Sequence, residues 1–125
     1  MTAVTTYGPL AARILIGVLF ILAGVGKLGN VEGFTGYLTS GGLPAFLAWP
    51  SIIFEIVLGV ALIVGYQTRI FALLGAAFCV VAGLLYHFDL ADQNQVNALL
   101  KNLAIAGGFL LLAANGAGRY AVDKA

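Results

Sequence analysis

The sequence predicts an all-α integral membrane protein, an antiparallel four-helix bundle with a short interfacial helix between the first two spans. Three observations support this fold class. Hydrophobic residues make up 62% of the 125 residues and charged residues only 9%, far from the composition of a water-soluble domain. A soluble domain of this size could not bury so large an apolar fraction. The chain also contains four apolar runs of about 20 residues, the length that crosses a bilayer.

The four runs predict four membrane-spanning helices within a single transmembrane domain, residues 1–125. The first begins directly after Pro9, which a helix tolerates in its first turn. Charged and turn-forming residues separate each run from the next, so the bounds can be estimated from the sequence. The predicted spans are residues 10–28, 44–66, 69–88 and 96–115.

The pattern in residues 29–43 predicts a short helix that lies in the membrane interface. Apolar residues recur there at helical spacing beside polar ones, as in helices that lie flat on a bilayer. The apolar set is Val31, Phe34, Tyr37 and Leu38. The next link, around Gln67, is short enough for a tight turn, whereas the link at 89–95 is polar and acidic.

Pro50, near the start of the second span, has two interpretations. Inside a helix, a proline frees the carbonyl four residues earlier, here that of Phe46, and kinks the helix. In the first turn, a proline instead marks where the helix begins. The sequence leaves both interpretations open.

The distribution of Lys and Arg favours cytoplasmic termini. With four spans, both termini and the link around Gln67 lie on one side of the membrane. That side carries more basic residues, and the positive-inside rule assigns it to the cytoplasm. It holds Arg13, Arg69, Arg119 and Lys124, against Lys27 and Lys101 on the other side. We expect Arg13 and Arg69, at span ends, to reach the lipid headgroups as anchors.

Each span carries one polar group that falls in the outer half of the membrane. Alternate spans run in opposite directions, so late residues of spans one and three share a depth with early residues of spans two and four. The four groups are Lys27, Glu55, His87 and Lys101. Ionisable groups within a membrane are costly and usually functional, and a histidine beside a carboxylate can relay protons near neutral pH. The structural alternative is a buried ion pair of Glu55 with Lys27 or Lys101 that fixes helix register, with His87 hydrogen bonded to it.

Several classes of function are excluded by what the sequence lacks. A net charge of +1 gives no basis for binding nucleic acid. The single cysteine, Cys79, allows neither a disulfide nor an iron–sulfur cluster within the chain, and we expect it to be a packing residue. The spans contain no facing histidine pair for haem, no dinucleotide fingerprint and no predicted metal site.

An ordered set of residues runs through the four spans and into the C-terminal tail. It comprises Arg13, Phe20, Ala23, Gly24, Lys27, Leu28, Pro44, Glu55, Gly59, Gly65, Arg69, Phe78, Tyr86, His87, Phe88, Lys101, Asn102, Ala106, Gly107 and Gly108, and the segment 116–123. Over about residues 11–123 this set resembles the DoxX family of small four-helix inner-membrane proteins.

The resemblance implies a redox-associated subunit of the cell's inner membrane that meets quinone or quinol. We expect Glu55 and His87 to exchange protons as the catalytic pair, and Lys27, Lys101 and Asn102 to bind the carbonyl end of the ring. The sequence shows no cofactor site of its own, so electron transfer would involve the bound quinone, a bound flavin that the sequence does not reveal, or a soluble or membrane redox partner protein. Two alternatives stay open: a non-catalytic scaffold subunit, and a small carrier for an anion or weak acid, which would require a homo-oligomer.

Overall fold

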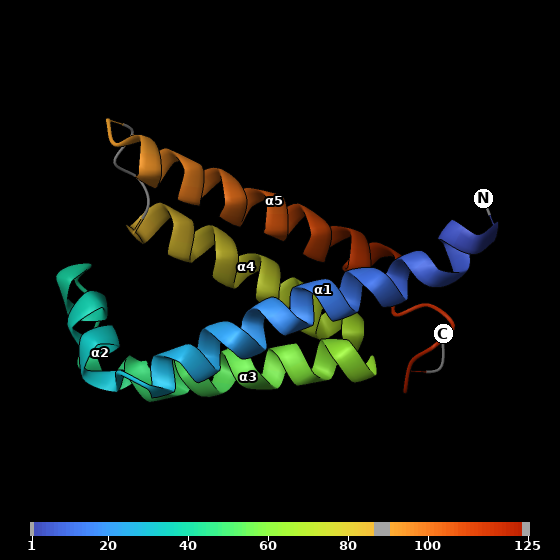
Figure 1. The fold of residues 1–125 in the computed structure, drawn as a ribbon, viewed down its shortest axis with the longest axis horizontal. Coiled ribbons are helices and arrows are strands. Elements are labelled where there is room, and N and C mark those ends of the chain that lie inside the picture. Colours follow the sequence, from blue (N-terminus) through green and yellow to red (C-terminus); the bar gives the residue numbers. More distant parts are fainter. Residues whose placement is uncertain (1, 87–90, 124–125) are drawn as a thin grey trace.

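The structure is a computed structural model that describes residues 2–86 and 91–123. Within this part of the chain all regular structure is helical, which confirms the predicted fold class (Figure 1). The elements are α1 (Thr2–Leu28), α2 (Val31–Ser40), the 3₁₀ helix η1 (Ala45–Leu47), α3 (Ala48–Val64), α4 (Thr68–Tyr86) and α5 (Gln93–Asn115).

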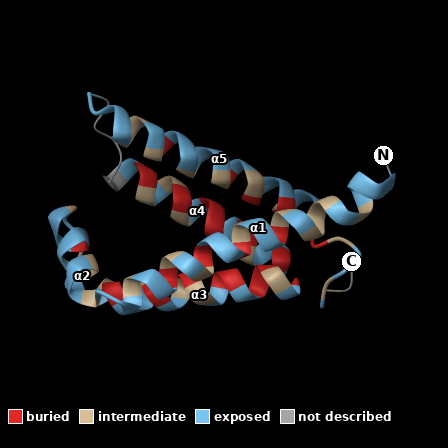
Figure 2. Cartoon of the chain, viewed as in Figure 1, coloured by how far each residue is buried: buried red, intermediate tan, exposed pale blue. Residues whose placement is uncertain are grey.

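The long helices form two antiparallel pairs. Helix α1 packs along α3, and α4 packs along α5. The pairs meet near the two chain termini and lie farther apart at the end where α2 stands (Figure 1). Buried residues follow the inward faces of the helices (Figure 2). The core is formed by Phe20, Leu58, Leu62, Ala72, Ala76, Cys79, Ala106, Phe109 and Leu112.

Glycines bring the helices of each pair into close contact. A Cβ atom on Gly59 of α3 would lie 2.6 Å from the Gly17 carbonyl oxygen of α1, and one on Gly17 would lie 2.8 Å from the Gly59 oxygen. On α4, a Cβ atom on Gly75 would lie 2.5 Å from the Phe109 ring of α5. A larger residue at these positions would prevent the close approach. In lipid no hydrophobic effect drives helices together, so the helices associate through the close van der Waals packing that glycine allows.

The helices that the structure describes differ in how readily they could cross a membrane. Helix α1, the segment Ala45–Val64 and helix α5 are long and apolar enough to span it, and Thr68–Leu84 of α4 is apolar but shorter. Large apolar side chains point outward, among them Leu15 at 72% exposure and Leu111 at 66%. Such a surface is suited to contact with lipid rather than with water.

Helix starts differ from the predicted spans where polar residues extend a helix beyond its apolar run. Helix α1 begins at Thr2, so Pro9 lies inside it, not in its first turn. Helix α5 begins at Gln93, because the Asp92 carboxylate accepts a hydrogen bond from the Asn94 amide as its N-cap. Helix α3 begins at Ala48, so Pro50 lies in the first turn, in agreement with the second interpretation above.

Helix α2 agrees with the short helix predicted between the first two spans. The Asn30 side chain begins it by accepting a hydrogen bond from the Gly33 amide at 2.9 Å. Leu38 is its buried apolar residue, and Tyr37 is exposed. Its position in the membrane interface stays a prediction.

Candidate functional site

A cavity of about 420 Å³ lies between the two helix pairs, and we call it the polar pocket. Its size falls within the range of ligand sites, about 300–1,000 Å³. Four of the five predicted site residues line it, and the fifth, His87, lies outside the described residues. The lining consists of Leu19, Phe20, Ala23, Lys27, Glu55, Phe78, Cys79, Lys101, Asn102 and Ile105.

One wall of the polar pocket carries an ion pair between α1 and α3. Lys27 Nζ lies 2.5 Å from Glu55 Oε1, and the Glu55 side chain is only 2% exposed. The Lys27 ammonium also lies 5.0 Å from the centre of the Phe34 ring of α2, a cation–π contact. A carboxylate so deeply buried requires a partner, and the pair fixes the register of α1 against α3.

The opposite wall, on α5, contributes Lys101 and Asn102. Lys101 is exposed and makes no hydrogen bond or ion pair with any residue that the structure describes. Asn102 is half-buried and approaches α4 beside Gly83, where a Cβ atom would lie 3.4 Å from the Asn102 amide nitrogen. With Lys27 and Glu55 neutralising each other, the described lining therefore has one cation left over for a ligand.

Aromatic side chains close the apolar side of the polar pocket. The Phe78 ring lies 6.2 Å from that of Phe20 and 5.3 Å from that of Phe54, between ring centres. Behind Phe78, between α3 and α4, a second cavity of about 400 Å³ opens, which we call the apolar groove. It is lined by Pro50, Ser51, Phe54, Leu74, Ala77, Phe78 and Val81.

Exposed aromatic residues indicate the depth of the polar pocket. Tyr7 and Tyr66 lie toward one end of the bundle and Trp49 toward the other, the arrangement that marks the two membrane interfaces. Tyr7 and Lys27 are about 20 residues apart in α1, which at 1.5 Å per residue is about 30 Å, the thickness of the hydrocarbon core. Glu55 lies one and a half turns inside Trp49, about 9 Å along α3. Along α3, the charged end of the pocket therefore lies about 9 Å from the exposed aromatic residue at its end of the bundle, and its depth in the membrane stays a prediction.

Arg13 is the residue whose role the sequence analysis missed. The prediction that it anchors to headgroups is wrong, because it is fully buried. Its Nη1 donates to the Leu62 carbonyl at 3.1 Å and the Ile63 carbonyl at 3.0 Å, and its Nη2 donates to the Tyr120 carbonyl. The last carbonyls of a helix have no intrahelical partners, so Arg13 satisfies those at the end of α3. The sequence feature that indicates its burial is helical spacing, because Arg13 shares one face of α1 with the other buried residues, Gly17, Phe20 and Gly24.

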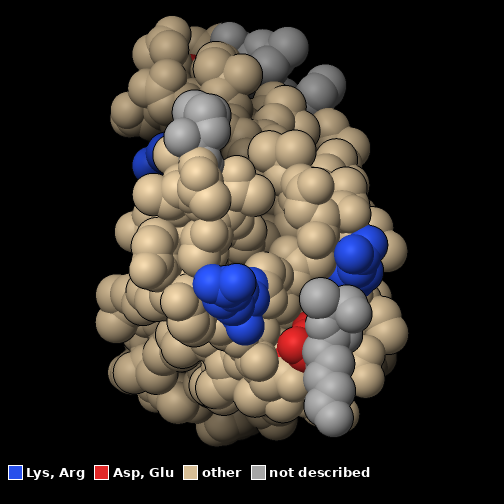
Figure 3. All heavy atoms as spheres, turned by 90° about the vertical axis from the view of Figure 1, so that its right-hand side faces the viewer, with Lys and Arg blue, Asp and Glu red and all other residues tan. Residues whose placement is uncertain are grey.

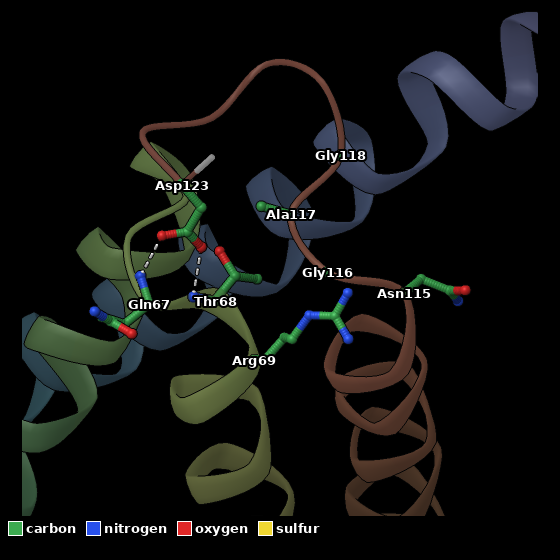
Figure 4. A pocket seen from close by; sticks show the side chains of 8 residues that line it. All are labelled: Gln67, Thr68, Arg69, Asn115, Gly116, Ala117, Gly118 and Asp123. Carbon is green, nitrogen blue, oxygen red and sulfur yellow. Dashed lines mark hydrogen bonds between the residues drawn. The ribbon is translucent and has the colours of Figure 1, made fainter. Parts of the chain in front are cut away.

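The C-terminal tail, residues 116–123, folds back across the same end of the bundle. The Val122 and Asp123 amides donate to the Val64 and Gly65 carbonyls. The Asp123 carboxylate accepts from the Gln67 and Thr68 amides, at 2.7 and 2.8 Å (Figure 4). Partial burial raises the pKa of Asp123, but hydrogen bonding from Thr68 and Gln67 and the nearby Arg13 charge outweigh this, so the pKa lies below its ordinary value.

A cavity at this end, of about 420 Å³, is bounded by Arg69, Asp123 and the tail (Figure 4). Arg69 donates to the Ala114 carbonyl at 3.0 Å, at the end of α5, and Asp123 already holds the first amides of α4. Viewed from this end, charged side chains form isolated patches in an otherwise uncharged surface (Figure 3). Because its charged groups satisfy helix ends, this cavity is less suited to a ligand than the polar pocket.

Comparisons with known proteins agree with this architecture. Residues 8–88, which include Lys27 and Glu55, match the family model described as DoxX. The inner membrane protein YqjF of Escherichia coli is 40% identical over 117 residues, covering 94% of this chain and 90% of that protein. The inner membrane protein YphA of Escherichia coli is 30% identical, covering 92% and 87%.

A more partial match is the Bacillus subtilis protein named "Putative oxidoreductase CatD", which is 35% identical over 69 residues, 55% of this chain and 52% of that protein. No solved structure matches the chain. The cytoplasmic position of the termini stays a prediction. The chain is a multi-pass protein of the inner membrane, and it belongs to the DoxX family.

Proposed function

We propose that the chain is the membrane subunit of a redox system and binds quinone or quinol in the polar pocket. The main supporting observation is that an ion pair between the half-buried Lys27 ammonium and the buried Glu55 carboxylate lies at one end of a cavity whose other walls are largely apolar. A quinone has the same two parts, a ring with carbonyl oxygens and an apolar chain. The name of the Bacillus subtilis relative, an oxidoreductase, supports redox chemistry for that protein and motivates it here.

The pocket residues divide into two roles in this proposal. Lys101, which has no partner among the described residues, and Asn102 donate hydrogen bonds to a ring oxygen. Lys27 Nζ holds a proton against Glu55, within reach of the same cavity. As the ring accepts electrons from the partner protein, Lys27 gives its proton to a ring oxygen, and Glu55 takes a proton from His87 and passes it to Lys27, which is then ready to deliver the second proton. His87 enters this scheme from the sequence alone.

A bound quinone supplies the chemistry of accepting two electrons and two protons. The electrons come from a soluble or membrane partner protein, because the sequence predicts no redox group in the chain itself. The pocket residues supply orientation and protons, and the apolar walls exclude water from the ring.

The test is ligand-dependent stabilisation of the protein in lipid nanodiscs, with a tailless benzoquinone as the probe. Replacing Lys101 by Met keeps the length of the side chain and removes its charge. A hydrogen bond from a charged donor is worth about 1.5–3 kcal/mol, so Lys101→Met should weaken binding about tenfold or more. Arg119→Met, an exposed cation on the C-terminal tail, is the matched control and should bind as the wild type does. A wild-type protein that the benzoquinone does not stabilise would refute the proposal.

The ion pair also favours a second candidate, a non-catalytic scaffold in which Lys27 and Glu55 serve helix register only. In that case the double variant Lys27→Met/Glu55→Gln should keep both its stability and its association with partner proteins, because a buried ion pair often adds little net stability. For the redox proposal, the same double variant should remain folded but lose benzoquinone-dependent stabilisation.

A further inference from the structure

We propose that the ligand of the polar pocket passes an isoprenoid chain behind its ring, past Phe78, into the apolar groove on the other side of the bundle. This inference rests on the proposed function, because it requires an amphipathic ligand in the polar pocket. It names the class of ligand more narrowly: a ring with polar oxygens that carries a long, unbranched run of isoprene units.

The two cavities adjoin each other and have one lining side chain in common. Phe78 is the residue that both described linings share. From Phe78, the polar pocket extends between α1 and α5, and the apolar groove extends between α3 and α4. The cavities are similar in size, about 420 and about 400 Å³. The groove is therefore large enough to receive the first isoprene units of a chain, and it adjoins the polar pocket at Phe78.

Phe78 packs against the edge of the core and is only partly enclosed by it. It is half-buried, whereas its neighbour Phe20 is 5% exposed. Its ring contacts Phe20 edge-on and Phe54 at a tilt. Each such contact stabilises by about 0.5–1.5 kcal/mol in addition to the burial of apolar area. In the proposed path this ring turns aside, and the chain passes from the polar pocket into the apolar groove at this point.

The charged end of the pocket and the groove are close along α3. Glu55 lines the polar pocket and Ser51 lines the groove, one helical turn apart, about 6 Å. The first isoprene units behind a ring held near Glu55 therefore reach the groove. On the α4 side, Leu74, Ala77 and Val81 recur on one face and give the groove an apolar floor, with the small Ala77 at its centre.

Any groove on a membrane protein can be filled by a lipid chain, so the position of the ligand's own chain has to be measured. The probe is a benzoquinone with a two-isoprene chain that ends in a photoreactive diazirine, used on the full-length protein in nanodiscs. After irradiation, peptide mass spectrometry locates the labelled residues. We expect label on Leu74 and Ala77, removed by an excess of tailless benzoquinone.

Two outcomes of this mapping would overturn the inference. Label confined to the mouth of the polar pocket, at Leu19, would mean that the chain leaves directly into lipid. Label in the groove that tailless benzoquinone does not displace would mean that the chain behaves as bulk lipid does. If tailless benzoquinone fails to bind the wild type at all, the proposed function fails instead, so the two failures are distinguishable.

Substitution of Phe78 tests the path itself. Phe78→Trp puts a larger side chain between the two cavities. It should lower the affinity for the benzoquinone with the isoprenoid chain, relative to the tailless benzoquinone, by about tenfold. Phe71→Trp is the matched control, because Phe71 lies on the same helix and lines a different surface of α3 and α4; its ratio should equal that of the wild type. If Phe78→Trp does not fold, Phe78→Leu can be used instead. It puts a smaller side chain between the two cavities and should increase labelling of the apolar groove. An unchanged ratio in folded Phe78→Trp would contradict the proposal.

Discussion

Arg13 offers a sharp test of how the bundle is held together. It donates three hydrogen bonds to main-chain carbonyls, two on α3 and one on the tail. Hydrogen bonds from a charged donor contribute about 1.5–3 kcal/mol each, which gives about 4.5–9 kcal/mol for three. Removing the guanidinium from the buried site also removes its desolvation cost of several kcal/mol, about half of that sum. We therefore expect Arg13→Met to lower the free energy of unfolding by about 2–4.5 kcal/mol.

The assay is equilibrium unfolding in mixed detergent micelles, followed by helical circular dichroism. The control is Arg69→Met at the same end of the bundle. Arg69 is exposed and its bonds to the Ala113 and Ala114 carbonyls are 3.4 and 3.0 Å long, so its loss should cost about 1 kcal/mol at most. Arg13→Lys should recover less than half of the loss, because an ammonium lacks the planar fork that reaches three carbonyls. If Arg13→Met were within about 1 kcal/mol of the wild type, the reasoning would be refuted and Arg13 would be an anchor after all.

Three further predictions follow from single contacts. Asp123→Asn should cost about 1 kcal/mol of stability near neutral pH, as the loss of a helix cap does. Because the pKa of Asp123 is depressed in the folded protein, its stabilisation is present above the ordinary pKa and disappears as the pH falls through the folded pKa. The melting temperatures of wild type and variant should therefore converge in thermal scans at acidic pH. Gly59→Ala should destabilise by about 1–3 kcal/mol through its clash with α1, whereas Gly107→Ala, where a Cβ atom meets nothing within 4 Å, should be neutral or stabilising in the same unfolding assay. Lys27→Met should lower the free energy of unfolding by about 3–5 kcal/mol, because it leaves Glu55 buried without its partner. Adding Glu55→Gln should restore most of the lost stability. Equal stability of the single and double variants would argue against a coupled pair.

The helices and one half of the site could be predicted because short-range spacing determines them. Apolar runs locate the long helices, and intervals of three and four residues place Gly59 and Glu55 on one face of α3. That face packs against α1, which carries Lys27, so the ion pair follows once α1 and α3 are neighbours. The polar and apolar sides of the pocket are likewise products of helical periodicity.

The bonding partners of the tail and of Arg13 could not be predicted, because they are main-chain groups far away in the sequence. The Arg13 bonds reach 49, 50 and 107 residues along the chain, and any residue type offers the same carbonyl. The bond from the Thr68 amide to Asp123 spans 55 residues and likewise leaves no local pattern. Helix starts at Thr2 and Gln93 were missed for a related reason, since hydropathy measures the apolar run and not the polar turns that continue it.

These long-range bonds are gathered at one end of the bundle, and this distribution bears on function. There the tail joins α3 to α4, and Arg13 and Arg69 tie α1, α3, α4 and the end of α5 together. At the α2 end the two helix pairs diverge (Figure 1). The ion pair described there, Lys27 with Glu55, joins α1 to α3 within one pair and does not link the two pairs. Local opening takes the least free energy where few bonds must break, so the pairs should separate most readily around the polar pocket. A ring too large for the mouth of the polar pocket could then pass between α1 and α5, and the bonded end would keep the bundle assembled while it did.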